Sequence, residues 1–94
     1  MLYAGGNMKD LLSEKDAEAL IDILTRELGV PEAQLTHDAS LEADLGADSL
    51  TRVEIIMALE DRFNLTIPDE RSEGVKTVGD VFELLAELVR PPAT

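Results

Sequence analysis

The sequence predicts an all-α fold, a small four-helix bundle with three main helices, one short helix and a long first loop. Apolar residues recur every three or four positions in three stretches of the chain, as on the buried face of a helix. Residues that favour helix starts and helix ends flank these stretches. No run of alternating apolar and polar residues indicates a strand. Together these three observations favour helices packed around one core.

The first helix is expected at residues 14–28. Ser13 is a suitable N-cap, and Asp16 stands three positions later, where its carboxylate can meet free backbone N–H groups. Gly29 suits the turn that ends a helix, and Pro31 blocks its continuation. The apolar face consists of Ala17, Leu20, Ile21, Leu24 and Leu28.

Residues 29–47 form a long connection, and connections of this length tend to be functional. Ordering so many residues costs conformational entropy that burial must offset. We therefore expect three leucines to hold the loop against the core: Leu35, Leu41 and Leu45. We assign residues 1–12 to a flexible N-terminal extension outside the core, 13–90 to the domain and 91–94 to a C-terminal tail.

The second helix is expected at residues 49–63, with Asp48 as its N-cap and Ser49 as its first residue. Its main apolar arc comprises Ile55, Ile56, Leu59 and Phe63. At about 100° per residue, a second strip of mixed apolar and acidic side chains runs through Leu50, Glu54, Met57 and Asp61. Such a strip suits the docking of a partner, and it is equally consistent with Leu50 and Met57 at the rim of the core.

Two further helices are expected in the last third of the chain. A short one covers residues 69–73, capped by Asp69 and stopped by Gly74. Thr77 caps the last helix, with Asp80 at the position of a capping box. The apolar face of this helix comprises Val78, Val81, Phe82, Leu85, Leu88 and Val89, and Pro91-Pro92 ends it.

Charge limits the classes of partner. Twenty acidic and eight basic residues give a formal net charge of −12, so nucleic acid and anionic membrane surfaces are disfavoured and a basic protein surface is favoured. Between positions 38 and 73 there are ten carboxylates and three arginines. No apolar run approaches the ~20 residues that a membrane span needs. The chain has no cysteine, which fits the cytoplasmic location that we expect.

Ser49 lacks the surroundings of a catalytic nucleophile. A serine nucleophile needs a base and an oxyanion site, and the chain has a single histidine, His37, and no GxSxG motif around Ser49. The nearby stretch EADLGADSL does not form an EF-hand loop either, because Ala43 or Ala47 would occupy its glycine position. We expect no metal ligands.

Modification of Ser49 is the remaining chemistry. A phosphate ester there would lie at a helix N-terminus, where free N–H groups and the helix dipole favour an anion by about 0.3–1 kcal/mol. The charge of Asp48 repels a phosphate on Ser49, so we interpret this acid as a contact site for an enzyme that carries a metal ion or a basic surface.

The stretch from Leu41 to Glu70, LEADLGADSLTRVEIIMALEDRFNLTIPDE, resembles the acyl carrier protein family. The segments that carry the resemblance are DLGADSL at 44–50, VE at 53–54, MALE at 57–60, IPDE at 67–70 and TVGDV at 77–81. The likeness covers roughly residues 13–90.

This resemblance implies a four-helix bundle without catalytic activity and a 4'-phosphopantetheine arm on Ser49. A phosphopantetheinyl transferase would install the arm from coenzyme A. Its thiol would carry acyl groups as thioesters between enzymes of fatty acid, polyketide or specialised lipid biosynthesis. The imported thiol would account for the absence of cysteine.

The resemblance also implies a role for individual positions. Asp48, Glu54, Glu60 and Asp61 match acids that face partner enzymes with basic docking patches, and Leu50 and Met57 match apolar contacts beside them. Ile67, Val75 and Leu59 would line the acyl cavity. We expect a monomer. A peptidyl or aryl carrier and an unmodified acidic interaction module remain the alternatives.

Three arginines depart from the pattern of housekeeping fatty-acid carriers: Arg52, Arg62 and Arg71. Arg52 lies near the apolar arc of the second helix, where we expect its stem to pack and its charged head to reach water. These departures leave a specialised carrier as plausible as a fatty-acid carrier.

Overall fold

The computed structural model describes residues 11–89, and this part of the chain is helical. Its elements are α1 (Glu14–Leu28), the 3-10 helix η2 (Glu32–Gln34), α2 (Ser49–Phe63), α3 (Asp69–Glu73) and α4 (Val78–Val89). The described residues contain no strand, and their one β-bridge joins Ser40 to Thr77. The expected all-α bundle is therefore confirmed, and the bounds of the four α-helices agree with those read from the sequence. Pro91-Pro92 lies outside the described residues.

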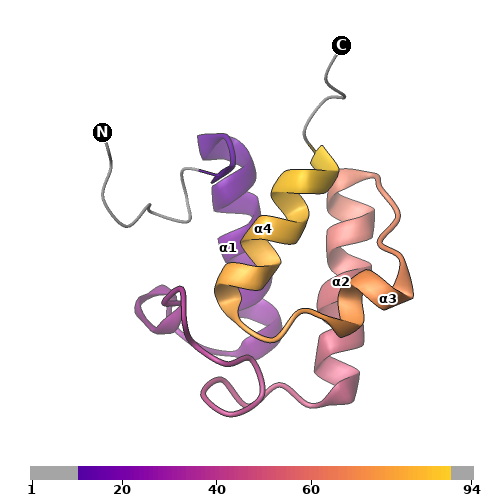
Figure 1. The fold of residues 1–94 in the computed structure, drawn as a ribbon. Coiled ribbons are helices and arrows are strands. Elements are labelled where there is room, and N and C mark those ends of the chain that lie inside the picture. The colour runs from indigo at the N-terminus through magenta and orange to yellow at the C-terminus, as the bar shows by residue number, and fades with distance from the viewer. Residues whose placement is uncertain (1–10, 90–94) are drawn as a thin grey trace.

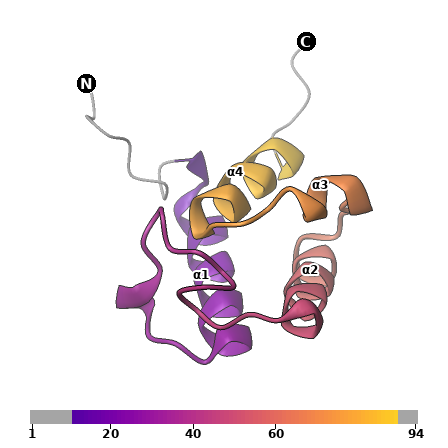
Figure 2. The same cartoon turned by 60° about the horizontal axis from the view of Figure 1, so that its bottom comes forward.

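The helices are arranged in two layers (Figures 1 and 2). α1 and α2 pack against each other, and α4 lies across them on one side. The short α3 lies beside the end of α4 and over α2 (Figure 2). The loop from 29 to 48 runs along one end of the bundle and leads into the start of α2 (Figure 1). This arrangement leaves one side of α2 without a covering helix.

Among residues 11–89, the buried core consists of aliphatic side chains and the ring of Phe82, with Phe63 partly buried against it. Its largest fully buried members are Phe82, Leu20, Leu24, Leu59, Leu85 and Val78. The structure differs from our expectation at Leu12, which we had assigned to a flexible extension. Leu12 is 8 % exposed and belongs to the core, whereas Leu11 beside it is 39 % exposed. The core therefore includes a residue before the expected domain boundary.

Most helix ends follow the sequence signals. The Ser13 hydroxyl accepts the Asp16 N–H at 3.2 Å, and Gly29 has a left-handed conformation with φ 68°. α2 ends similarly, because Asn64 adopts φ 54° and its N–H reaches the Glu60 carbonyl. The expected cap of α3 was wrong: Asp69 is the first helical residue, and the N-cap is Pro68, which makes no side-chain cap.

Burial and backbone hydrogen bonds hold the long loop in place. The three leucines expected to anchor it are buried, and so are Ala39 and Ala47. Three hydrogen bonds join the loop to the entry of α4: Leu41 N–H to the Lys76 carbonyl at 2.9 Å, Val78 N–H to the Ala39 carbonyl at 3.0 Å, and Gly79 N–H to the His37 carbonyl at 2.9 Å. The loop is thus fixed to the last helix of the chain.

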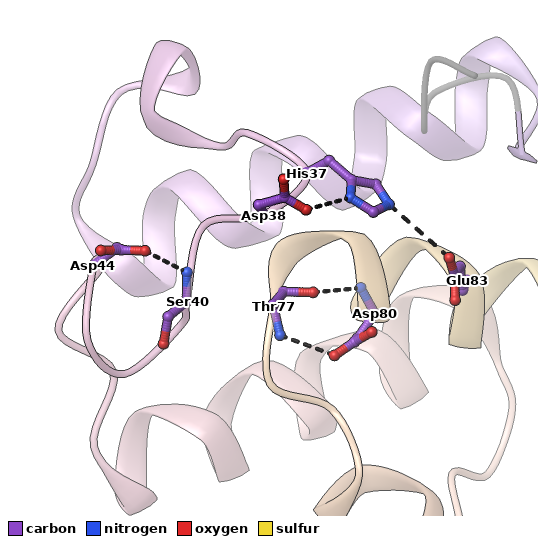
Figure 3. A network of polar contacts seen from close by, with 7 residues as sticks. All are labelled: His37, Asp38, Ser40, Asp44, Thr77, Asp80 and Glu83. Carbon is purple, nitrogen blue, oxygen red and sulfur yellow. Dashed lines mark hydrogen bonds and ion pairs between the residues drawn. The ribbon is translucent and has the colours of Figure 1, made fainter. Parts of the chain in front are cut away.

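A capping box starts α4, as expected from the sequence (Figure 3). The Thr77 hydroxyl accepts the Asp80 N–H at 3.1 Å, and the Asp80 carboxylate accepts the Thr77 N–H at 3.1 Å. The same carboxylate accepts the Lys76 N–H at 3.0 Å. These hydrogen bonds, first that of Lys76, lower the pKa of Asp80 below its ordinary value.

His37 joins the loop to α4 through its side chain (Figure 3). Its Nδ1 donates to the Asp38 carboxylate at 3.0 Å, and its Nε2 lies 4.0 Å from the Glu83 carboxylate. The hydrogen bond to Asp38 raises the pKa of His37, and the charges of Asp38, Glu83 and Asp80 act in the same direction. The imidazole lies against Gly79, where a Cβ would be 2.5 Å from Nε2, so a larger residue there would displace the exposed imidazole.

Leu12→Ala is expected to lower the free energy of unfolding by about 2–3 kcal/mol, because it removes buried methyl groups from the core. Urea unfolding followed by circular dichroism measures the change. Leu11→Ala is the matched control and should lie within about 0.5 kcal/mol of the wild type, since the side chain is largely exposed. Equal effects of the two substitutions would show that Leu12 lies outside the core.

Asp80→Asn is expected to destabilise the protein at pH 7 and to have little effect at pH 3. The pKa of Asp80 is lowered in the folded state, so its charged form contributes stability above the ordinary value of 3.8, and this contribution is lost as the pH falls. The difference in melting temperature between wild type and variant should therefore narrow below about pH 4. Asp61→Asn, at an exposed position, is the control. If the difference in melting temperature between the wild type and Asp80→Asn did not change with pH, the expectation would be contradicted.

Candidate functional site

The turn before α2 directs Asp48 and Ser49 away from the core. Ala47 is buried, and its N–H donates to the Leu41 carbonyl at 2.7 Å. Gly46 precedes it with φ 75°, a conformation that glycine adopts without steric cost. After this buried residue the chain returns to the surface, and the next two residues, Asp48 and Ser49, are both exposed.

A second turn supports this segment from the side (Figure 3). The Asp44 carboxylate accepts the Ser40 N–H at 2.7 Å, and the Ser40 hydroxyl accepts the Ala43 N–H at 3.0 Å. Asp44 therefore closes the loop that carries the DLGADSL segment. Such local side-chain hydrogen bonds stabilise turns.

Asp48 is the N-cap of α2, as the sequence indicated. Its carboxylate accepts the Thr51 N–H at 2.8 Å. Hydrogen bonds from the backbone and then from the side chain of Thr51 lower the pKa of Asp48, so this residue is a carboxylate at neutral pH. The acid that we expected to face partners therefore also fixes the start of the helix.

Ser49 is the first residue of α2, and its hydroxyl is accessible from outside. In the described part of the chain this hydroxyl makes no hydrogen bond. His37 contacts Asp38, Glu83 and Gly79 instead of Ser49, so the structure does not bring the histidine to the serine. An exposed, unbonded hydroxyl at a helix N-terminus fits an added phosphate group.

The uncovered side of α2 exposes three large apolar side chains beside acidic ones. Leu50 is 65 % exposed, Val53 52 % and Met57 61 %. Glu54 and Asp61 are also exposed on this helix. The exposed strip of Leu50, Glu54, Met57 and Asp61 is therefore present, and Leu50 and Met57 do not belong to the rim of the core.

Val53 was missed in the sequence analysis. It lies three positions after Leu50 and four before Met57, so the helical spacing that selected those two residues also selects Val53. We define the docking strip as the exposed residues Leu50, Val53, Glu54, Met57 and Asp61. Its apolar and acidic side chains share one surface.

Glu60 differs from the other expected docking acids. Its carboxylate accepts the Ile67 N–H at 2.7 Å, and the residue is half-buried. The contact ties α2 to the segment that leads to α3. Glu60 therefore stabilises this connection, a role that helical periodicity alone does not indicate.

A cavity of about 440 Å³ lies between α2 and α3. Ile67 and Val75 line it, as expected for an acyl cavity, and Ser49 lies at its edge. The expectation for Leu59 was wrong: this side chain is fully buried in the helical core and is not among the lining residues.

Two kinds of feature are absent from the described residues. Within 11–89, no three His, Asp or Glu side chains converge as metal ligands would. No helix in that range has the length and apolar character needed to cross a membrane.

Comparison with known proteins identifies the kind of domain. The family described as "Phosphopantetheine attachment site" matches residues 18–85. An acyl carrier protein from Syntrophobacter fumaroxidans is 47 % identical over 68 residues, which cover 72 % of this chain and 84 % of that protein. A solved structure considered an acyl carrier protein of Mycobacterium tuberculosis superposes with a TM-score of 0.69 at 36 % identity, covering 74 % of this chain and 93 % of that one. These matches favour a modified carrier over an unmodified acidic module.

Proposed function

Because the chain belongs to the acyl carrier protein family, we propose that the Ser49 hydroxyl carries its phosphopantetheine group through a phosphodiester. The protein is a non-catalytic carrier of acyl groups, and phosphopantetheine is its cofactor. The observation that supports Ser49 is its exposed, unbonded hydroxyl at the start of α2 and at the edge of the cavity. The matched family segment includes this position.

The chemistry of the chain fits this division of roles. Phosphopantetheine supplies the terminal thiol that forms thioesters, and the chain itself has no cysteine. In the described structure no side chain accepts a hydrogen bond from the Ser49 hydroxyl, so we expect the transferase that attaches the group to activate this hydroxyl. Asp48, which is held charged and close to the serine, suits an enzyme that brings a metal ion or a basic side chain.

The carrier interacts with the synthase and transferase enzymes that load and use its arm. For these contacts we propose the docking strip, with Asp48 beside it. Exposed ion pairs contribute about 0–1 kcal/mol each, so several carboxylates mainly steer the encounter with basic patches. Leu50, Val53 and Met57 offer apolar area for a brief contact. Weak contacts of this kind suit a carrier that visits several enzymes.

The proposal includes the setting of the protein. We place the carrier in the cytoplasm as a monomer, with residues 13–90, extended to the buried Leu12, as its single domain. It would serve fatty acid, polyketide or specialised lipid biosynthesis. The acidic surface supports soluble enzymes as partners and disfavours nucleic acid.

Ser49→Ala is expected to abolish attachment of phosphopantetheine. Wild type and variant are incubated with coenzyme A and a broad-specificity phosphopantetheinyl transferase, and intact mass is measured. The wild type should gain one phosphopantetheine and Ser49→Ala none. Ser72→Ala is the matched control, because Ser72 lines the same cavity and its hydroxyl already donates to the Asp69 carbonyl at 2.9 Å. A wild type of unchanged mass, or a modified Ser49→Ala, would contradict the proposal.

Glu54→Lys is expected to slow this loading about threefold or more at low salt, with folding unaffected, because it reverses a charge in the field that steers the transferase. Added salt should reduce the difference. Glu18→Lys makes the same charge change on the exposed face of α1 and should have a smaller effect. Equal rates for the wild type and Glu54→Lys at low salt would refute the docking strip.

A further inference from the structure

The cavity between α2 and α3 has both an apolar and a polar lining. Its volume of about 440 Å³ lies within the range of ~300–1,000 Å³ typical of ligand pockets. Apolar side chains of Ile55, Ile67 and Val81 contribute to it. Its polar lining includes Arg52, Glu60, Asp69, Ser72 and Glu73. A saturated hydrocarbon chain that entered would therefore meet charged groups as well as an apolar wall.

Arg52 spans this cavity. It lies one helical turn after Ser49 on α2, and its Nη2 donates to the Ser72 carbonyl at 3.0 Å and to the Val75 carbonyl at 2.7 Å. Both carbonyls belong to the end of α3 and the residues that follow it. The guanidinium is part-buried and joins the two walls of the cavity, while its nitrogens without a hydrogen bond remain in contact with water, so the expected packed stem and solvated head describe only part of its surroundings.

α3 has few other attachments. Its five residues include no buried side chain, and no side chain caps its start. An ion pair between Arg71 and Glu87 joins it to α4. A segment with so little buried apolar surface opens locally at low cost, so the Arg52 hydrogen bonds add to the hold exerted by the buried Ile67 and Val75 on either side of α3.

We propose that Arg52 is a latch that holds α3 against α2 and keeps long saturated acyl chains out of the cavity. The inference rests on the proposed function, since it takes the acyl group to be tethered at Ser49. A chain that enters from Ser49 passes Arg52, and a chain long enough to push α3 away from α2 displaces the guanidinium from two carbonyls. A saturated chain offers no acceptor in exchange, and an unpartnered charged donor in a partly buried site is costly. The latch makes Arg52 a specificity-determining residue.

The test compares acyl chains on the modified full-length protein. Wild type, Arg52→Leu and Arg62→Leu are each loaded with acetyl or octanoyl thioesters, and cleavage by hydroxylamine is followed together with the amide NMR shifts of Ile67, Val75 and Val81. Arg62 is the matched control, because it is exposed on the same helix and makes no ion pair or hydrogen bond within the described residues.

In the wild type and in Arg62→Leu, octanoyl and acetyl thioesters should be cleaved at nearly equal rates with similar shifts. In Arg52→Leu the octanoyl thioester should be cleaved about tenfold more slowly than acetyl, the change expected from removing a charged hydrogen bond that opposes entry. An octanoyl thioester already protected in the wild type, or an Arg52→Leu variant that behaves as the wild type does, would overturn the latch.

Failure of the proposed function is recognised separately, because no group would then be attached to Ser49 and no thioester would form. In that case the proposed role of Arg52 is tested by measuring amide hydrogen exchange on the unmodified chain. Arg52→Leu should speed exchange at Ser72, Gly74 and Val75 about tenfold, whereas Arg62→Leu should not. Arg52→Gln, which keeps a polar donor without the charge, gives the same comparison if Arg52→Leu does not fold. Unchanged exchange at these amides would overturn the latch.

Discussion

The loop between α1 and α2 can be ordered only because burial offsets the entropy lost in fixing its backbone. Its buried leucines and alanines supply apolar contacts, and its hydrogen bonds to the entry of α4 satisfy backbone groups that would otherwise lack partners. The position of Ser49 depends on this arrangement, since the buried Ala47 two residues earlier decides which way the chain leaves the loop. A residue that contacts little itself is thus placed by side chains from the whole bundle.

α2 serves two environments at once. Ile55 and Leu59 are buried against the core, while the opposite side exposes apolar and acidic residues that no other helix within residues 11–89 covers. Exposed aliphatic groups of this size lower solubility when they cluster, and the surrounding negative charge counteracts self-association. The same combination favours short-lived contact with basic surfaces over permanent assembly. The negative charge and the uncovered face of α2 therefore act together to favour short-lived contact with basic partners.

Sequence patterns predicted much of this structure because the relevant interactions are local. Ser13, Gly29, Asp48 and the pair Thr77–Asp80 act within one helical turn, so their spacing is sufficient to identify them. The N-cap of α3 was a local error, whereas the other differences concern contacts that extend beyond one helical turn. Glu60 reaches Ile67, and Arg52 reaches Ser72 and Val75, with long side chains whose direction helical periodicity does not specify. Leu12 was assigned to the extension because one buried residue before a helix has no period to reveal it.

The near absence of buried side chains in α3 has a consequence for the divergence of such carriers. Substitutions in a segment that contributes little to the core carry a small thermodynamic penalty, so its residues can change without loss of folding. This segment also forms one wall of the cavity, so if the cavity receives the acyl group as proposed, new cargo preferences can arise there by neutral drift. The part of the molecule most tolerant of mutation is then also the part where a carrier can be recruited to a different pathway.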